Sequence, residues 1–212
     1  MPGSQSSVSG GAFSKNDLMP QTEPPPQDIL SVLSSLTEWF SDQNVAYAIV
    51  EGVAIGLIAQ PRATEDIDAV AWIDLIDLPS LLKRGANFGF VSRLADPLSF
   101  AENSRMVLLT HTESGLSVDI SCGALPFERE MIDRSTEFKV NRLILKVATP
   151  EDLLITKAVA HRNKDLIDIE NLLTVYPYLD LSRVRYWIKQ FAEVLEMPEL
   201  LMDLEGCLKR RN

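Results

Sequence analysis

The stretch PRATEDIDAVAW, residues 61–72, places two carboxylates two positions apart in a segment that is otherwise mostly apolar. Asp66 and Asp68 alternate with Ile67 and Ala69, and this period predicts a β-strand with both carboxylates on one face. Two like charges at that spacing repel each other. We therefore expect a cation, from the protein or from a ligand, to lie close to this face.

A glycine junction precedes these acids. Residues 45–50 form a short apolar run typical of a strand, Gly52 follows almost at once, and residues 53–59 predict a helix that ends before Pro61. A turn from strand to helix presents free backbone N–H groups and the positive end of the helix dipole, which favour an anion. Because Gly52 has no side chain, a triphosphate can approach the backbone closely there.

A third acid completes the pattern. Residues 116–121 alternate as a strand with Asp119 near the centre. If this strand lies beside the strand of Asp66 and Asp68, three carboxylates meet at one end of a sheet. Hard oxygen ligands of this kind suit Mg²⁺ or Mn²⁺, which also hold substrate phosphates, so the pattern indicates phosphoryl or nucleotidyl transfer. The alternative is an unrelated α/β protein with solvated acids, which predicts that Asp119 lies far from Asp68.

The remaining patterns predict an α/β (α+β) fold in which a mixed-sheet core precedes a helical C-terminal domain. Residues 1–27, rich in Ser, Gly, Gln and Pro, are predicted to be a disordered N-terminal tail. The core would span residues 28–149. A helical domain over 150–212 would begin at Thr149-Pro150-Glu151-Asp152, which combines a hydroxyl cap, a first-turn proline and acids. We expect helices over residues 28–43 (capped by Asp28), 78–88, 127–134, 150–161, 164–174, 181–195 and 198–209, a strand over 106–111, and a hairpin over 138–147.

The charge of the chain limits its partners. Its 212 residues carry a formal net charge of −10 with a pI near 4.7, which argues against broad adhesion to nucleic acid or anionic membranes. This balance favours a small or cationic acceptor. A concentrated basic face would reverse that preference, and the candidate residues for such a face are Arg129, Arg134, Lys139, Arg142 and Lys146.

Cysteine usage and hydropathy predict the compartment. Cys122 and Cys207 lack the spacing of a zinc site or a disulfide framework, which fits a reducing environment. The most apolar window, residues 45–59, is interrupted by Glu51 and is too short to span a bilayer. The N-terminus does not resemble a secretory signal. We therefore expect a cytoplasmic protein with no membrane partner.

Together these residues resemble the nucleotidyltransferase superfamily related to DNA polymerase β. Its pattern is a Gly-Gly or Gly-Ser after a strand, a short helix, Asp-x-Asp or Asp-x-Glu on the next strand, and a third acid later. The resemblance covers about residues 45–173. Within the superfamily the chain looks most like the AbiEii toxin-like group, on the segments EGVA (residues 51–54) and PRATEDID (residues 61–68) and the downstream Lys157, Arg162, Lys164, Asp165 and Asp168.

The resemblance implies an enzyme that moves an NMP from an NTP to an acceptor hydroxyl. Asp66, Asp68 and Asp119 would be catalytic and would ligate Mg²⁺ or Mn²⁺, and Asp119 would also help to activate the hydroxyl. Lys157, Arg162 and Lys164 would form a cationic wall across the cleft from the metal ions. The full set of implied nucleotide-binding residues is Gly52, Val53, Arg62, Lys157, Arg162, Lys164 and Asp165.

The acceptor stays open at this point. The toxin-like group suggests tRNA, and hence a possible toxin of a type IV toxin–antitoxin system with an antitoxin as partner. Other superfamily members modify small antibiotics. Val53 departs from the pattern, which has a second glycine or a serine there. Its side chain cannot donate a hydrogen bond to a phosphate, and its branch would crowd the approach. A catalytically weakened nucleotide-binding regulatory module is therefore a further alternative.

Overall fold

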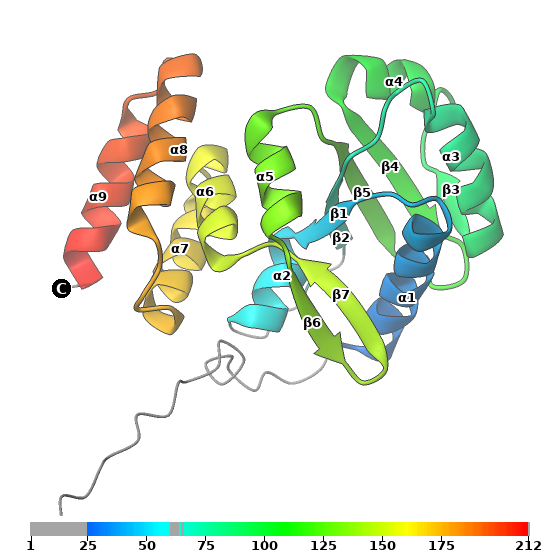
Figure 1. Ribbon diagram of the computed structural model, residues 1–212, viewed down its shortest axis with the longest axis horizontal. Coiled ribbons are helices and arrows are strands. Elements are labelled where there is room, and N and C mark those ends of the chain that lie inside the picture. The colour runs from blue at the N-terminus through cyan, green and yellow to red at the C-terminus, as the bar shows by residue number, and fades with distance from the viewer. Residues whose placement is uncertain (1–24, 60–63, 65, 212) are drawn as a thin grey trace, which may run out of the picture.

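Seven strands form one mixed sheet with the carboxylate-bearing strands near its centre (Figure 1). The structure is a computed structural model that describes residues 25–59, 64 and 66–211, except the side chains of Asn163 and Arg211. Of the predicted tail, residues 1–27, residues 1–24 lie outside the described part of the chain. The strands are β1 (Tyr47–Val50), β2 (Asp66–Ala71), β3 (Phe90–Ser92), β4 (Met106–His111), β5 (Ser117–Cys122), β6 (Thr136–Val140) and β7 (Leu143–Val147).

The strand order across the sheet is β3-β4-β5-β2-β1-β7-β6. The pairs β2–β5 and β1–β7 are parallel, and the other neighbouring pairs are antiparallel. The predicted strand over residues 106–111 and the predicted hairpin are both present, with Asn141 in the left-handed region at the hairpin turn (φ 55°). The mixed-sheet α/β fold predicted from the sequence is therefore confirmed.

Alternation along the central strands separates an apolar face from a face that carries acids. On β2, Ile67 and Ala69 are buried, whereas Asp66 is exposed and Asp68 is half-buried. On β5 the buried positions also alternate with half-buried ones, and Asp119 is half-buried. The alternation with a period of two that predicted these strands therefore matches the alternation of buried and half-buried side chains in the sheet.

Helix α1 (Gln27–Asp42) packs its aromatic side chains against the apolar face. Trp39 stacks on Phe90 with ring centroids 5.2 Å apart, and Phe40 lies 4.9 Å from Tyr47. The predicted cap of this helix was wrong. Pro26 precedes the first helical residue, and Asp28 lies inside the first turn, where its side chain accepts a hydrogen bond from the N–H of Ile29 at 2.9 Å.

The remaining elements of the core connect the strands. They are α2 (Glu51–Ile58), α3 (Leu78–Gly85), the 3-10 turn η2 (Ala86–Phe88), α4 (Pro97–Ser104) and α5 (Pro126–Arg134). Strand β3 and helix α4 were not predicted from the sequence. The strand has only three residues. Helix α4 does carry a start signal, because Asp96 caps it by accepting from the N–H of Ser99 at 3.1 Å, immediately before Pro97.

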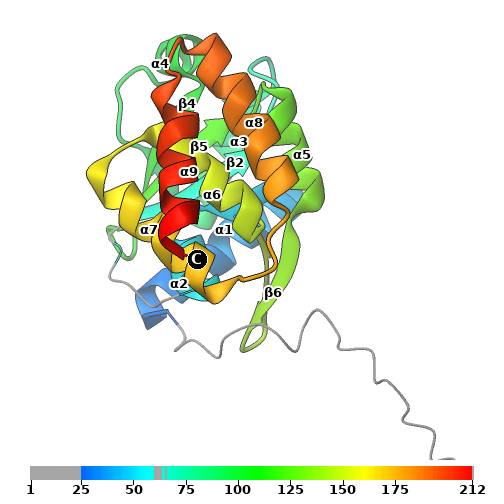
Figure 2. The same ribbon diagram turned by 90° about the vertical axis from the view of Figure 1, so that its left-hand side faces the viewer.

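Four C-terminal helices stack at one end of the sheet, drawn from yellow to red in Figures 1 and 2. Thr149 caps the first of them as predicted, because its hydroxyl accepts from the N–H of Asp152 at 3.3 Å. Their buried side chains belong to the same apolar cluster as those of the sheet. No helix in the described part of the chain is both long and apolar enough to cross a membrane. The four are α6 (Pro150–Ala160), α7 (Asn163–Val175), α8 (Leu181–Val194) and α9 (Glu199–Arg211).

A buried acid ties these helices to the core. Asp152, on α6, is fully buried and accepts from Arg183 of α8 at 2.7 Å and from the Thr149 hydroxyl at 2.8 Å. The guanidinium of Arg134, from α5, lies 3.6 Å away. Because a buried carboxylate is stable only with partners, this contact fixes α5, α6 and α8 together.

We predict opposite effects for two glycine-to-alanine substitutions. A Cβ atom at Gly85 would lie 2.7 Å from Cζ2 of the fully buried Trp39, so Gly85→Ala should lower the unfolding free energy by about 1–3 kcal/mol. In α9, a Cβ atom at Gly206 would meet only Nη1 of Arg210 at 3.7 Å, so Gly206→Ala should raise it by up to about 1 kcal/mol. Urea denaturation measures both. A destabilising Gly206→Ala, or a neutral Gly85→Ala, would contradict this packing.

Candidate active site

Asp68 and Asp119 lie directly opposite each other on neighbouring parallel strands. Their Cα atoms are register partners, and adjacent strands lie about 4.8 Å apart. Asp66 begins β2 on the same face, opposite Ser117, and accepts a hydrogen bond from the Thr64 hydroxyl at 3.0 Å. The alternative in which Asp119 lies far from Asp68 is therefore wrong. Three acids share one patch of the sheet.

The start of helix α2 lies beside this patch. Val50, the last residue of β1, is the register partner of Asp68, and α2 follows directly. Glu51 makes the turn with its backbone in the left-handed region (φ 54°), a conformation that residues other than glycine seldom adopt. Gly52 and Val53 thus lie in the first turn of α2, where backbone N–H groups lack helical partners.

Val53 does not crowd this junction. Its side chain is only 4% exposed and belongs to the apolar core. The expectation that its β-branch obstructs a phosphate is therefore wrong. What Val53 offers to the site is its backbone N–H group.

Asp68 is the carboxylate with the most unfavourable surroundings. Burial, and then the negative charges of Asp66, Glu51 and Asp119, raise the pKa of Asp68 to about 7, and Lys157 only partly opposes this. Within the described part of the chain, its side chain accepts no hydrogen bond and forms no ion pair. Among the described residues, no cationic side chain is bonded to Asp68, although four acids crowd this face.

Arg93 places a positive charge next to the acids of the sheet, as the sequence led us to expect. It follows β3, and its guanidinium donates to Asp119 and, at 3.3 Å, to the hydroxyl of Ser117. Burial raises the pKa of Asp119, and the charge of Arg93 opposes that rise. No sequence pattern points to Arg93, because β3 is too short to predict and the contact joins residues 26 positions apart.

Lys157 is buried beneath the glycine junction. It is 1% exposed, donates to Glu51, and lies 3.2 Å from both Asp165 and Asp168. Burial alone would lower the pKa of Lys157, but the hydrogen bonds and charges of these acids raise it overall. The predicted cationic wall across the cleft would therefore include a lysine that is buried and already bound to acids. Lys157 connects α6 to the first residue of α2 and to α7.

The other predicted nucleotide-binding residues occupy different positions. The half-exposed Arg162 donates through Nε to the buried Asp165 at 2.6 Å, and its Nη2 lies 3.6 Å from Glu51. Asp165 also accepts the backbone N–H of Arg162 at 3.2 Å and so caps α7. Lys164 is exposed on the first turn of α7. Arg62 lies outside the described residues.

The acids fit a divalent cation in their chemistry. All donors are carboxylate oxygens, which Mg²⁺ and Mn²⁺ prefer, and Asp66, Asp68 and Asp119 are the residues that would hold such an ion. As the side chains stand, no group of three His, Cys, Asp or Glu within the described residues is arranged around one ion position. Arg93 contacts one oxygen of Asp119 instead.

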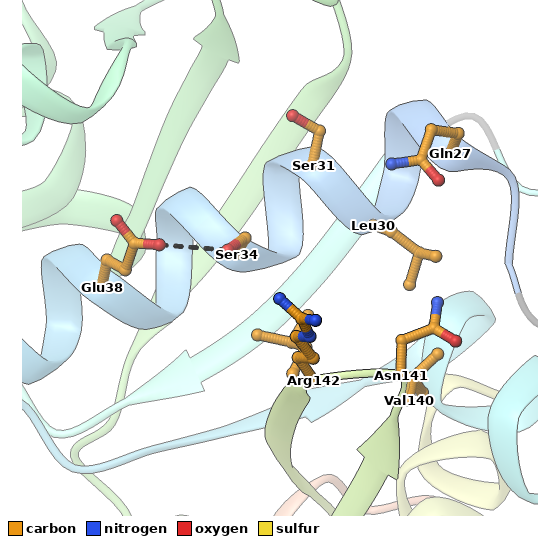
Figure 3. Close-up of a pocket in the computed structure, with 9 residues that line it drawn as sticks. Gln27, Leu30, Ser31, Ser34, Glu38, Val140, Asn141 and Arg142 are labelled. Atoms are coloured by element: carbon orange, nitrogen blue, oxygen red, sulfur yellow. Dashed lines mark hydrogen bonds between the residues drawn. The ribbon is translucent and has the colours of Figure 1, made fainter.

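A pocket of about 360 Å³ opens beside Asp68 and Asp119. The strands β2 and β5 line it together with helices α5, α6 and α8. A different hollow of about 480 Å³ lies between α1 and the β6–β7 turn (Figure 3), where Leu30 and Arg142 face it. None of the predicted site residues lines that hollow. Of these two hollows, the one beside the acids is lined by predicted site residues, namely Asp68 and Asp119.

Comparison with solved structures identifies the class of fold. An antigenic nucleotidyltransferase-like protein from Paracoccidioides brasiliensis matches with a TM-score of 0.52 and 19% identity, over 88% of this chain and 95% of that chain. The antibiotic-resistance factor ANT(2'')-Ia matches with a TM-score of 0.53 and 12% identity, over 81% of this chain and 95% of that chain. No protein-family profile and no curated protein matches the chain. The chain therefore has a nucleotidyltransferase fold.

We predict that Asp68→Asn stabilises the protein at high pH. A carboxyl whose folded pKa is about 7, against an ordinary value of 3.8, binds its proton more tightly in the folded state. Wild-type stability should therefore fall relative to the variant as the pH rises from about 4 to about 7. At pH 8 the variant should be more stable by about 1–2 kcal/mol once solvent screening is allowed for.

Urea denaturation from pH 4 to 8 with EDTA present checks this prediction. The difference between the two proteins should be smallest near pH 4, where Asp68 is protonated in the folded state and only about half ionised in the unfolded state. A difference that does not change with pH would mean that the charge of Asp68 is compensated.

We predict that Lys157→Met strongly destabilises the fold. The change removes one cation from three acids, two of which are buried, and should cost about 3–5 kcal/mol in urea denaturation. Lys164→Met is the matched control on an exposed lysine, with an expected effect within about 0.5 kcal/mol. Equal effects of the two substitutions would rule out the network as a structural element.

Proposed function

We propose that the protein is a metal-dependent nucleotidyltransferase that moves an NMP from an NTP to the hydroxyl of an acceptor. The observation that carries the proposal is the register pairing of Asp68 with Asp119 beside the first turn of α2. This pairing brings acids that are separated in sequence to the place where a strand-to-helix junction can receive a phosphate. The nucleotidyltransferase fold supports the same reading.

The residues divide into two tasks. The N–H groups of Gly52 and Val53 would bind the triphosphate, and the side chains of Arg93 and Arg162 would contribute positive charge from the two sides of the junction. Asp66, Asp68 and Asp119 would hold the metal. Mg²⁺ or Mn²⁺ would supply positive charge that neutralises the phosphate oxygens.

The transfer breaks one phosphoester bond and forms another. The acceptor oxygen attacks the α-phosphorus, the bond to the bridging oxygen of the β-phosphate breaks, and pyrophosphate leaves. The proton of the hydroxyl passes to a carboxylate oxygen of Asp119, which lies on the same face as Asp68. Lys157 and Asp165 act as positioning residues in this proposal, because they hold Glu51 and the start of α7.

Two competing functions lose support. The catalytically weakened module depended on Val53, whose side chain lies in the core and so does not crowd a phosphate, although it also cannot donate a hydrogen bond as a serine would. The tRNA-directed toxin, with its antitoxin partner, would need a basic face. Of the candidate bases, Arg129 is paired with Asp133 at 3.1 Å and Lys146 with Glu137 at 2.8 Å. We therefore propose a small-molecule acceptor rather than tRNA.

We predict that Asp68→Asn and Asp119→Asn each reduce transfer by about 100-fold or more, because each removes negative charge from the proposed metal site. The assay follows α-labelled NTPs with Mg²⁺ in the presence of bulk tRNA or a panel of hydroxylated small molecules. Asp133→Asn, on the exposed face of α5, is the control and should retain activity. Nucleotide binding without transfer, unchanged by Asp68→Asn, would reject the proposed function.

A further inference from the structure

We propose that the acceptor is a small molecule with an apolar body and a cationic amine, bound in the pocket beside Asp68. The inference rests on the proposed function, since it names the substrate class of the same site. It is drawn from the chemistry of the side chains that line the pocket.

The charged groups of the pocket all have one sign. Glu51, Asp68, Asp119 and Glu128 line it, and no lysine or arginine in the described part of the chain does so. A cavity with only acidic charge attracts a cation and repels a polyanion such as RNA. The overall charge of the chain acts in the same direction.

These acids are not equally available to a ligand. Glu128 accepts hydrogen bonds from the N–H groups of Ala124 and Leu125 at 2.8 and 2.9 Å, so its carboxylate stabilises the start of α5. Glu51 and Asp119 have cationic partners outside the pocket lining. Asp68 has no hydrogen bond or ion pair among the described residues, so in the metal-free protein it is the acid of the lining that is open to an incoming amine.

The opposite wall of the pocket is apolar. Phe127 and Phe191 meet edge to face, with centroids 5.4 Å apart and an interplanar angle of 88°. Leu125, Met131 and Val159 continue this wall. Such a surface buries a ring or an aliphatic skeleton, and aromatic rings next to acids also suit an organic cation.

The dimensions favour a small ligand. About 360 Å³ lies in the range of pockets that hold drug-sized molecules. The triphosphate would lie along the first turn of α2, with Arg93 and Arg162 outside the pocket lining. The acceptor would thus enter from the acidic and apolar side, and the NTP from the side of the helix terminus.

The test compares three probes that share a phenylpropyl skeleton and differ in charge: phenylalaninol (cationic), 3-phenylpropan-1-ol (neutral) and 3-phenyllactate (anionic). Binding to the full chain is followed by NMR or calorimetry at pH 7, without NTP or metal. Phenylalaninol should bind about fivefold or more tightly than the neutral alcohol, and the anion most weakly. Because no turnover is required, failure here is separate from failure of the transfer assay.

Matched variants locate the binding. Leu125 lines the pocket and is 47% exposed, whereas Leu195 is 46% exposed and lies outside the lining. Leu125→Lys should weaken phenylalaninol binding about tenfold, and Leu195→Lys should leave it unchanged. Leu125→Gln, which removes apolar contact without adding charge, should weaken it by about threefold at most.

The following outcomes would overturn the proposal. These are no binding of phenylalaninol at about 10 mM, a preference for the anionic probe, and equal effects of Leu125→Lys and Leu195→Lys. Binding of a short oligoribonucleotide that perturbs the NMR signals of Met131 and Val159, while the three probes do not bind, would assign the pocket to RNA and also reject it.

Discussion

The parallel pairing of β2 with β5 is the constraint on which the candidate site depends. Asp68 faces Asp119 only in the observed register. A slip of one residue would turn one strand's acids toward the apolar face, where the neighbouring Ile67 and Val118 are now buried. Burying unpaired carboxylates there is prohibitively unfavourable. The apolar pattern that builds the core therefore also aligns the acids.

A second constraint fixes the start of α2 relative to the acids on β2 and β5. Glu51 holds a backbone conformation that is unfavourable for a residue with a side chain. Its carboxylate is bound by the buried Lys157, whose other partners, Asp165 and Asp168, belong to α7. The helical part of the chain is thus tied directly to the phosphate-facing junction. A lysine that sequence reasoning assigned to the nucleotide instead shapes the backbone that would receive it.

The sequence predicted those features of the site that local periodicity encodes. Alternation placed Asp66, Asp68 and Asp119 on strands, and the strand order of the mixed sheet then brought them together. The contact between Arg93 and Asp119 could not be predicted in the same way, because it joins a three-residue edge strand to the sheet centre. Nor does a pattern show that Lys157 is buried, since a lysine among apolar neighbours can also extend to solvent.

The distribution of charge around the junction fits the two unlike substrates of the proposed transfer. Phosphates would meet backbone N–H groups and the side chains of Arg93 and Arg162, whereas the charged residues that line the pocket beside Asp68 are all acids. In the proposed reaction, Asp66, Asp68 and Asp119 would hold the metal, and the acidic charge of the pocket lining would attract an amine. Because the apolar wall comes from α5, α6 and α8, the buried Asp152 that joins these helices also sets the width of the acceptor side. In this proposal, the β2–β5 pair therefore contributes to the phosphate site and to the acceptor site.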